Sequence, residues 1–248
     1  MNRRISFLLG SIFLVFIANA DAQVGKGSGL WNWTQEAKHH QAIVKVDAGD
    51  GSGTGIVIHV DKSKPIKDGY EGYCLTAWHV VKDIHDSSIK VNYRNERRSK
   101  GCRVVDFDKD RDVALIWAWV PGEIEPAKLA QEPIKGGDEL EFAGLGGGSD
   151  LTNCLRHFSA VASSPSSMEK IFADVPLLPG DSGGPVFNEN QEVVGIISGG
   201  WFWWDGGVKL PNGSQINATW PARASNIDPI KVLVADIESA KSTTTSKY

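Results

Sequence analysis

The sequence contains little cysteine. Its 248 residues include three, Cys74, Cys102 and Cys154, and no two of them form a CxxC pair. Three cysteines are too few for a disulfide-scaffolded mini-protein, and nothing in their spacing indicates a zinc site. Both Cys74 and Cys102 lie on strand-like runs of the first half, so a bridge between them is one pairing the sequence allows. Sequence alone does not determine connectivity, and an odd number leaves at least one thiol unpaired in a monomer.

The chain also lacks a strong net charge and a long apolar run. A formal net charge of −4 gives no electrostatic reason to expect a nucleic-acid partner. The apolar run from Ile5 to about Ala18 is shorter than the ~18 to 20 residues that span a bilayer, and it follows the basic segment 2–4. This layout is typical of a secretory signal peptide. We predict cleavage after Ala22, a secreted or periplasmic mature protein, and no stable membrane insertion.

Short runs rich in β-branched and aromatic residues make up most of the rest. They are punctuated by Gly, Asp, Asn and Pro, which favours an all-β antiparallel sandwich or barrel over repeated βαβ units. Residues 121–137 carry three prolines and no strand pattern, and we interpret them as a linker between two β halves, at about 40–120 and about 138–225. The runs span residues 42–46, 54–60, 73–78, 89–93, 102–107, 113–120, 139–145, 158–163, 170–175 and 192–198.

One helical pattern lies near the C-terminus. Apolar residues recur at i, i+3, i+4 and i+7 from Ile230 to Ile237, Asp228 can cap, and Pro229 suits the first helical position. These features predict a helix over 229–238 that packs on the second half. Residues 239–248 are rich in Ser, Thr and Lys and are predicted to form a disordered tail.

The most specific motif is GDSGGP at residues 180–185. A serine hydroxyl is a poor nucleophile alone, and it gains reactivity on a tight turn whose backbone N–H groups can also receive a developing oxyanion. Glycines on both sides of Ser182 permit such a turn and leave room for a substrate carbonyl. An ordinary surface turn is the alternative, but the full motif between two strand-like runs favours a nucleophile.

No histidine follows Ser182, which restricts the possible base. In an α/β-hydrolase esterase the histidine comes after the serine, so the sequence disfavours that fold and fits the order His, Asp, Ser. His79 directly follows the strand-like run 73–78 and is the predicted general base. The other five histidines are predicted to have surface or packing roles; they are His39, His40, His59, His85 and His157.

The third candidate comes from the aspartate-rich run 106–112. Asp112 abuts the apolar segment 113–116, and a carboxylate at a strand edge can be buried enough to hold an imidazole in one tautomer. A calcium loop is excluded because position 6 is Arg111 rather than Gly and position 12 is Trp117 rather than Glu. Asp108 and Asp110 are predicted to be solvated loop residues.

Together, Thr76-Ala77-Trp78-His79, Asp112-Val113-Ala114-Leu115 and GDSGGP resemble the three signatures of the trypsin-like, chymotrypsin-fold serine peptidases. The lead-in Gly51-Ser52-Gly53-Thr54-Gly55 and the spacing are most similar to the bacterial HtrA-type branch. The resemblance covers roughly residues 40–235. It implies a peptidase domain at 23–238 with two antiparallel six-stranded β-barrels, His79 and Asp112 in the first and Ser182 in the second.

The resemblance also implies roles for main-chain groups. The backbone N–H groups of Gly180 and Ser182 would form the oxyanion hole, and Ser198, Gly199 and Gly200 would pair with the substrate backbone. His79 would take the Ser182 proton, an acyl-enzyme would form, and water would release it. Such an endopeptidase acts on polypeptides and needs no cofactor or metal.

The sequence departs from the trypsin pattern in several places. Pro176 stands where trypsin itself has an aspartate, so cleavage after Lys or Arg is not implied. No Ile-Val-Gly-Gly activation sequence is present, and Asp181 therefore needs another partner: Arg156, Arg223 or a backbone donor. The residues after Ser182 are needed for the remaining strands and helix, so no PDZ module is expected. The alternative function is a catalytically inactive pseudopeptidase that binds peptides in the same cleft.

Overall fold

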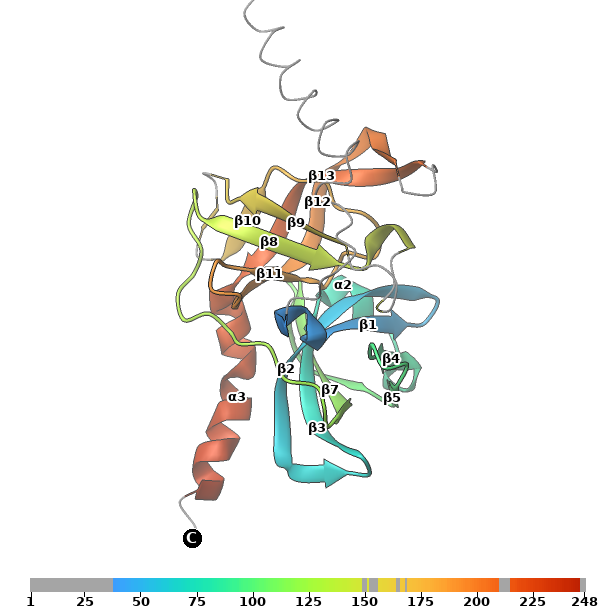
Figure 1. Cartoon of the computed structure of the whole chain (residues 1–248), viewed down its shortest axis with the longest axis vertical. Coiled ribbons are helices and arrows are strands. Elements are labelled where there is room, and N and C mark those ends of the chain that lie inside the picture. The colour runs from blue at the N-terminus through green and yellow to red at the C-terminus, as the bar shows by residue number, and fades with distance from the viewer. Residues whose placement is uncertain are drawn as a thin grey trace, which may run out of the picture.

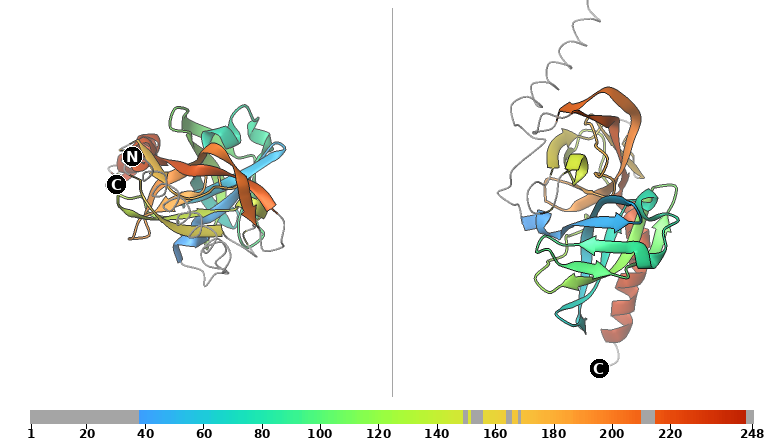
Figure 2. Two further views of the ribbon diagram at one scale, coloured as in Figure 1. Left: turned by 90° about the horizontal axis from the view of Figure 1, so that it is seen from above. Right: turned by 90° about the vertical axis from the view of Figure 1, so that its right-hand side faces the viewer.

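The computed structural model describes residues 38–148, 151, 156–163, 166–167, 169–209 and 215–245. The predicted signal peptide at 1–22 and Cys154 lie outside the described residues. Two curled antiparallel sheets make up most of the described chain, one above the other in Figure 1 and again in the side view of Figure 2. The predicted chymotrypsin-like architecture is confirmed.

The first sheet has seven strands in the order β5-β4-β1-β2-β3-β7-β6. The edge strand β5, which the sequence pattern did not indicate, brings the number above the expected six. Buried apolar residues such as Val57, Leu75 and Ile116 fill its interior. The strands are β1 (Ile43–Ala48), β2 (Gly51–Ile66), β3 (Gly69–Thr76), β4 (Ile89–Asn92), β5 (Arg98–Lys100), β6 (Arg103–Asp108) and β7 (Val113–Pro121).

The second sheet has six described strands in the order β10-β13-β12-β11-β8-β9. Phe142, Phe187 and Ile196 are fully buried in its core. The strand β13, which the sequence pattern also missed because Pro221 interrupts it, pairs with both β12 and β10. The strands are β8 (Glu139–Gly144), β9 (Arg156–Val161), β10 (Lys170–Ala173), β11 (Pro185–Phe187), β12 (Val193–Lys209) and β13 (Gln215–Asn226).

Short helical turns connect these strands, and a long helix follows them. The turns are η1 (Lys38–Ala42), α2 (Trp78–Val81), η2 (Asp86–Ser88) and η3 (Gly146–Gly148). Between the sheets, residues 122–138 run without a regular strand, held by bonds such as Ala127 N–H to the Val57 carbonyl (2.9 Å). This segment is the one that the prolines indicated as a linker.

The C-terminal helix α3 (Ile227–Thr245) is longer than the predicted 229–238. It begins earlier, at Ile227, whose N–H donates to the Asn226 side-chain oxygen (2.8 Å), so Asp228 lies in the first turn rather than before it. It includes residues 239–245, which we expected in a disordered tail, because adding residues to an existing helix is easier than starting one. The helix contacts strands of both sheets and runs down beside the first (Figure 1). No described helix is long and apolar enough to cross a membrane.

Cys74 and Cys102 are both buried and unbridged, so the pairing that the sequence allowed does not form. The Cys102 thiol contacts the oxygens of Ser99 within its own turn instead (3.4 and 3.7 Å). Burial raises the pKa of both thiols above the ordinary cysteine value. Both side chains therefore act as small apolar groups in the first core.

Candidate active site

His79 is positioned by the short helix α2 at the end of β3. The neighbouring Trp78 ring stacks on the Phe107 ring of β6, with centroids 3.9 Å apart and an interplanar angle of 9°. This contact fixes α2 against the first sheet. The His79 side chain is 40% exposed and faces the space between the two sheets.

Asp112 holds His79 through two hydrogen bonds. Its Oδ1 accepts from the His79 backbone N–H (2.8 Å), and its Oδ2 lies 2.7 Å from His79 Nδ1. Asp112 has a φ of 58°, a left-handed conformation that aspartate tolerates better than most residues. Burial of Asp112 acts to raise its pKa, but bonds from His79 and Ser198 outweigh burial and lower the pKa below the ordinary value. The pair leaves His79 Nε2 available to act as a base.

Ser182 lies on a turn that requires glycine on both sides. Gly180 and Gly183 have φ values of 101° and 87°, which L-residues with a side chain rarely adopt. A Cβ atom on Gly183 would lie 2.1 Å from the Thr54 carbonyl oxygen. The conformation that GDSGGP indicated is therefore present.

The buried Asp181 carboxylate is held by backbone donors. Its Oδ1 accepts from the Gly146 N–H and its Oδ2 from the Leu178 N–H, both at 2.8 Å. The sequence left three possible partners for Asp181, namely Arg156, Arg223 or a backbone donor, and the structure shows backbone donors. Arg223 instead donates to the Ser198 hydroxyl (3.2 Å), and the Arg156 side chain lies outside the described part of the chain.

Thr54 of β2 connects the turn at residues 180–183, called the serine turn below, to the first sheet. Its N–H donates to the Ser182 carbonyl (2.8 Å) and its hydroxyl donates to the Gly180 carbonyl (2.7 Å). The same hydroxyl oxygen accepts from the Leu145 N–H (2.9 Å). The role of Thr54 is not evident from the glycine-rich lead-in around it, because its side-chain partners are up to 126 residues away.

The Ser182 hydroxyl points toward Ser198 rather than His79. It donates to the Ser198 carbonyl oxygen (3.3 Å), and no hydrogen bond between described residues joins it to the imidazole. The Ser198 side chain in turn donates to Asp112 Oδ2 (2.5 Å). Ser198 therefore bonds to both Ser182 and Asp112. From the sequence, only a substrate-binding role was predicted for Ser198, and these contacts were not.

Two backbone N–H groups of the serine turn have no protein acceptor among the described residues, those of Gly180 and Ser182. The carbonyl of each preceding residue is already bonded: Pro179 accepts from Gly147 (3.2 Å) and Asp181 from Gly184 (2.9 Å). In a trans peptide the N–H points opposite to the carbonyl. Both N–H groups are thus directed away from these supporting segments.

His79, Asp112 and Ser182 line one cleft of about 640 Å³. Ser198, Gly199 and Gly200 line it as well, so the structure brings these six predicted residues to one place. Gly180 is not among the lining residues. The cleft also contains both basic and acidic groups, namely Lys82, Lys109 and Arg223 beside Asp110 and Asp112.

Comparison with known proteins agrees with this architecture. A family model described as the trypsin-like peptidase domain matches residues 53–196, more than half of the chain. The chain belongs to the trypsin-like peptidase domain family. It is homologous to the DegP and HtrA serine endoproteases.

Two curated relatives illustrate the similarity. A probable periplasmic serine endoprotease DegP-like of Pseudomonas fluorescens is 33% identical over 151 residues, which cover 59% of this chain and 29% of that protein. The periplasmic pH-dependent serine endoprotease DegQ of Escherichia coli is 27% identical over 152 residues, covering 59% and 31%. The matched region is less than a third of the length of these relatives.

Solved structures share the fold at low identity. The HtrA-type protease AlgW with a tripeptide has a TM-score of 0.57 at 16% identity, with 80% of this chain and 62% of that chain covered. The active form of the Rv3671c protease from M. tuberculosis has a TM-score of 0.54 at 21% identity, covering 79% and 81%.

Proposed function

We propose that this protein is a secreted or periplasmic serine endopeptidase that hydrolyses peptide bonds through His79, Asp112 and Ser182. The observation that carries the proposal is the His79–Asp112 pair lying in one cleft with a glycine-flanked serine. Family membership supports the class of reaction, and the periplasmic relatives support the location.

The first step is proton transfer from Ser182 to His79 Nε2. It requires the Ser182 side chain to rotate from the Ser198 carbonyl toward the imidazole, a change of rotamer about one bond. Ser182 Oγ then forms a bond to the scissile carbonyl carbon, and the carbonyl oxygen becomes an oxyanion. Asp112 stabilises the imidazolium through Nδ1 and keeps the ring in one orientation.

The N–H groups of Gly180 and Ser182 receive that oxyanion. Two observations support this role: neither N–H has an acceptor among the described residues, and the bonded Pro179 and Asp181 carbonyls set the direction of the two N–H groups. His79 then returns the proton to the leaving amine, and an acyl-enzyme remains. Water attacks the ester with His79 as base and restores Ser182.

Ser198, Gly199 and Gly200 bind the substrate main chain beside the nucleophile. They line the cleft on β12, and an extended peptide can add to such a strand through backbone hydrogen bonds. These bonds do not depend on the substrate side chain, so they suit a polypeptide substrate in general.

The test combines a covalent probe with protein digestion. Purified protein and its Ser182→Ala variant are treated with a fluorophosphonate, and casein digestion is followed in parallel. We expect labelling and digestion by the parent protein and at least a thousandfold loss of digestion rate in the variant. A folded parent protein that neither labels nor digests casein would overturn the proposal and favour peptide binding without cleavage.

A further inference from the structure

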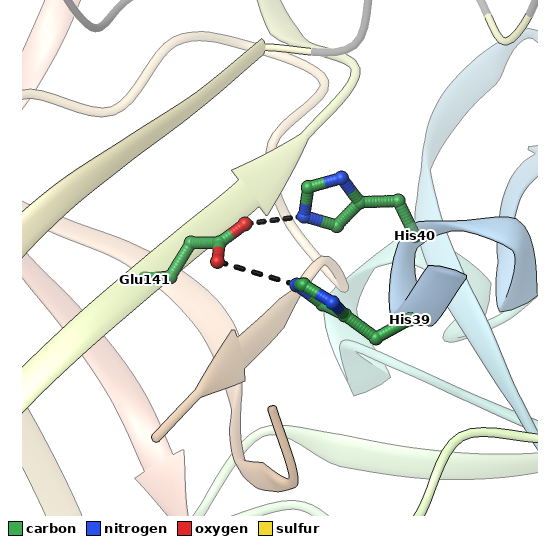
Figure 3. A group of neighbouring side chains, drawn as sticks. All are labelled: His39, His40 and Glu141. Carbon is green, nitrogen blue, oxygen red and sulfur yellow. Dashed lines mark hydrogen bonds and ion pairs between the residues drawn. The ribbon is translucent and has the colours of Figure 1, made fainter. Parts of the chain in front are cut away.

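A second group of titratable side chains lies away from the cleft, where η1 meets β8. His39 and His40 of η1 direct their Nε2 atoms toward the two carboxylate oxygens of Glu141 (Figure 3). The distance from His39 Nε2 to Glu141 Oε2 is 3.2 Å, and His40 Nε2 contacts Oε1. Glu141 is 102 and 101 positions from the two adjacent histidines in sequence, so their convergence is a product of the tertiary fold.

The group is partly enclosed by apolar surface. The side chains of His39 and His40 are 8% and 4% exposed, whereas that of Glu141 is 24% exposed and leaves a path to solvent. The Phe187 ring packs edge-on against His39, with centroids 4.6 Å apart. A site with buried nitrogen donors and one accessible carboxylate is shielded from water yet reachable by a small ion.

We propose that His39, His40 and Glu141 bind a divalent transition-metal ion, with Zn²⁺ as the expected occupant. Two imidazoles and one carboxylate form a ligand set that suits such ions, and three protein ligands leave a position for water. Oxygen-preferring ions such as Ca²⁺ and Mg²⁺ are disfavoured because two of the three donors are nitrogen.

The spacing of the donor atoms fits an ion between them. One ligand atom from each residue lies within 4.8 Å of the others. Around tetrahedral Zn²⁺, with bonds of about 2.0 to 2.1 Å, neighbouring donors are separated by about 3.3 Å. The His39 to Glu141 distance already has this value, and small side-chain rotations would admit the ion.

A bound ion would join the two halves of the fold. The segment η1 leads directly into β1 of the first sheet, whereas β8 belongs to the second. Metal binding would therefore add stability to the docked arrangement, because an ion that binds only the folded state shifts the equilibrium toward that state. The inference does not depend on the proposed peptidase activity.

The experiment measures Zn²⁺ binding and its effect on melting temperature. Protein carrying Ser182→Ala, which prevents self-digestion, is stripped with EDTA and dialysed free of it. Calorimetric titration with Zn²⁺ is expected to show one saturable site. Zn²⁺ at 100 times Kd should raise Tm by about 5 to 10 °C. Co²⁺ in place of Zn²⁺ should give the visible absorption of a four-coordinate nitrogen and oxygen site.

Two variants test the ligands, with one matched control. Glu141→Gln keeps the size of the side chain and a hydrogen-bond acceptor but removes the charge, and His40→Gln removes one imidazole. Each should weaken Zn²⁺ binding by about 100-fold or more and abolish the Tm increase, since metal affinity depends on deprotonated ligands. His85→Gln removes an exposed histidine near η2 and should bind like the parent protein.

Three results would overturn the metal site. One is the absence of saturable Zn²⁺ binding below about 1 mM, which lies at the weak end of specific affinities. Another is unchanged binding in Glu141→Gln with an unchanged fold by circular dichroism. The third is an equal loss of binding in His85→Gln. Each would show that the cluster is only a hydrogen-bonded contact between η1 and β8.

Discussion

The two sheets contribute to the cleft in different ways. On the first, His79 and Asp112 are joined by two short hydrogen bonds, so the proposed base and its carboxylate are already arranged in the protein alone. On the second, the Ser182 hydroxyl bonds to a carbonyl of its own sheet instead of the base. The backbone around Ser182 is nevertheless held firmly, by Asp181 from within the sheet and by Thr54 from the other one.

This difference separates two requirements of catalysis. The proposed acid–base pair is joined by two bonds inside the first sheet and receives one further bond from Ser198 of the second, whereas the turn that carries Ser182 is bonded both within its own sheet and to Thr54 of the first. Changes to the first kind of contact should reduce activity far more than stability. Changes to the second should affect stability and activity together.

The largest effect is expected from Asp112→Asn. Asparagine tolerates the left-handed conformation at this position, so the fold should be retained, but the amide stabilises the wrong imidazole tautomer. We expect kcat for a peptide substrate to fall about ten-thousandfold. Asp110→Asn, a neighbouring carboxylate of the same cleft, is the control and should change kcat less than about threefold. Similar losses in both variants would contradict the assignment of Asp112.

Thr54→Val tests the connection between the sheets. Valine has nearly the same shape but leaves the Gly180 carbonyl and the Leu145 N–H without the hydroxyl partner. The free energy of unfolding should fall by about 1 to 3 kcal/mol. Displacement of the serine turn should reduce kcat/KM by about 10- to 100-fold.

Thr76→Val is the control for Thr54, because it removes a buried hydroxyl that bonds within the first sheet, to the Thr54 carbonyl. Chemical denaturation and steady-state kinetics on both variants measure the two effects. We expect a similar loss of stability and a smaller loss of kcat/KM than for Thr54→Val. Equal kinetic losses would show that the serine turn does not depend specifically on the Thr54 hydroxyl.

Ser198→Ala removes the contact that links the two halves of the site. The hydroxyl donates to Asp112 Oδ2, and a hydrogen bond to a charged group contributes about 1.5 to 3 kcal/mol net. Because water can replace part of it, we expect kcat/KM to fall about tenfold. Ser225→Ala, which removes a buried hydroxyl on the neighbouring strand β13, should alter stability but not kcat/KM. If Ser198→Ala and Ser225→Ala have the same kcat/KM, the Ser198 hydroxyl does not contribute to the active site.

The smallest expected effect is on the pH dependence of stability. The pKa of Asp112 is lower in the folded state than the ordinary value of 3.8, so its stabilising contribution is complete above about pH 5. The contribution is lost as pH falls through the lower, folded-state pKa. Urea unfolding of the parent protein and Asp112→Asn should therefore give a difference in unfolding free energy that shrinks between pH 6 and pH 2.5. A difference that grows toward low pH would have the opposite sign and contradict the lowered pKa.

Much of the site was predictable from local sequence. The family resemblance of the three motifs implied that His79, Asp112 and Ser182 meet in one cleft, which all three line, and the glycines around Ser182 have the left-handed conformations that their positions indicated. These features are encoded within a few residues of each reactive group. The division into two β halves was likewise visible in the prolines between them.

Contacts between distant segments could not be predicted in this way. The sequence around Thr54 is that of an ordinary strand threonine, and only the folded structure shows that its hydroxyl bonds to the Gly180 carbonyl. The strand β13 was missed because Pro221 weakens its local pattern, whereas pairing with neighbours on both sides determines its conformation. His39 and His40 were predicted only as surface or packing residues, since nothing near them in sequence indicates Glu141.

The order of the elements along the chain has a consequence for biosynthesis. The first sheet, with the proposed acid–base pair, is translated before Ser182, and the pairing of β12 with β13 is complete only when Asn226 has been made. Domains of a nascent chain fold as units from the N-terminus. The described strand β13 supplies Thr219 and Arg223 to the cleft lining, so a ribosome-bound chain has no complete cleft until β13 has been translated, and under the proposed function activity begins only after that point.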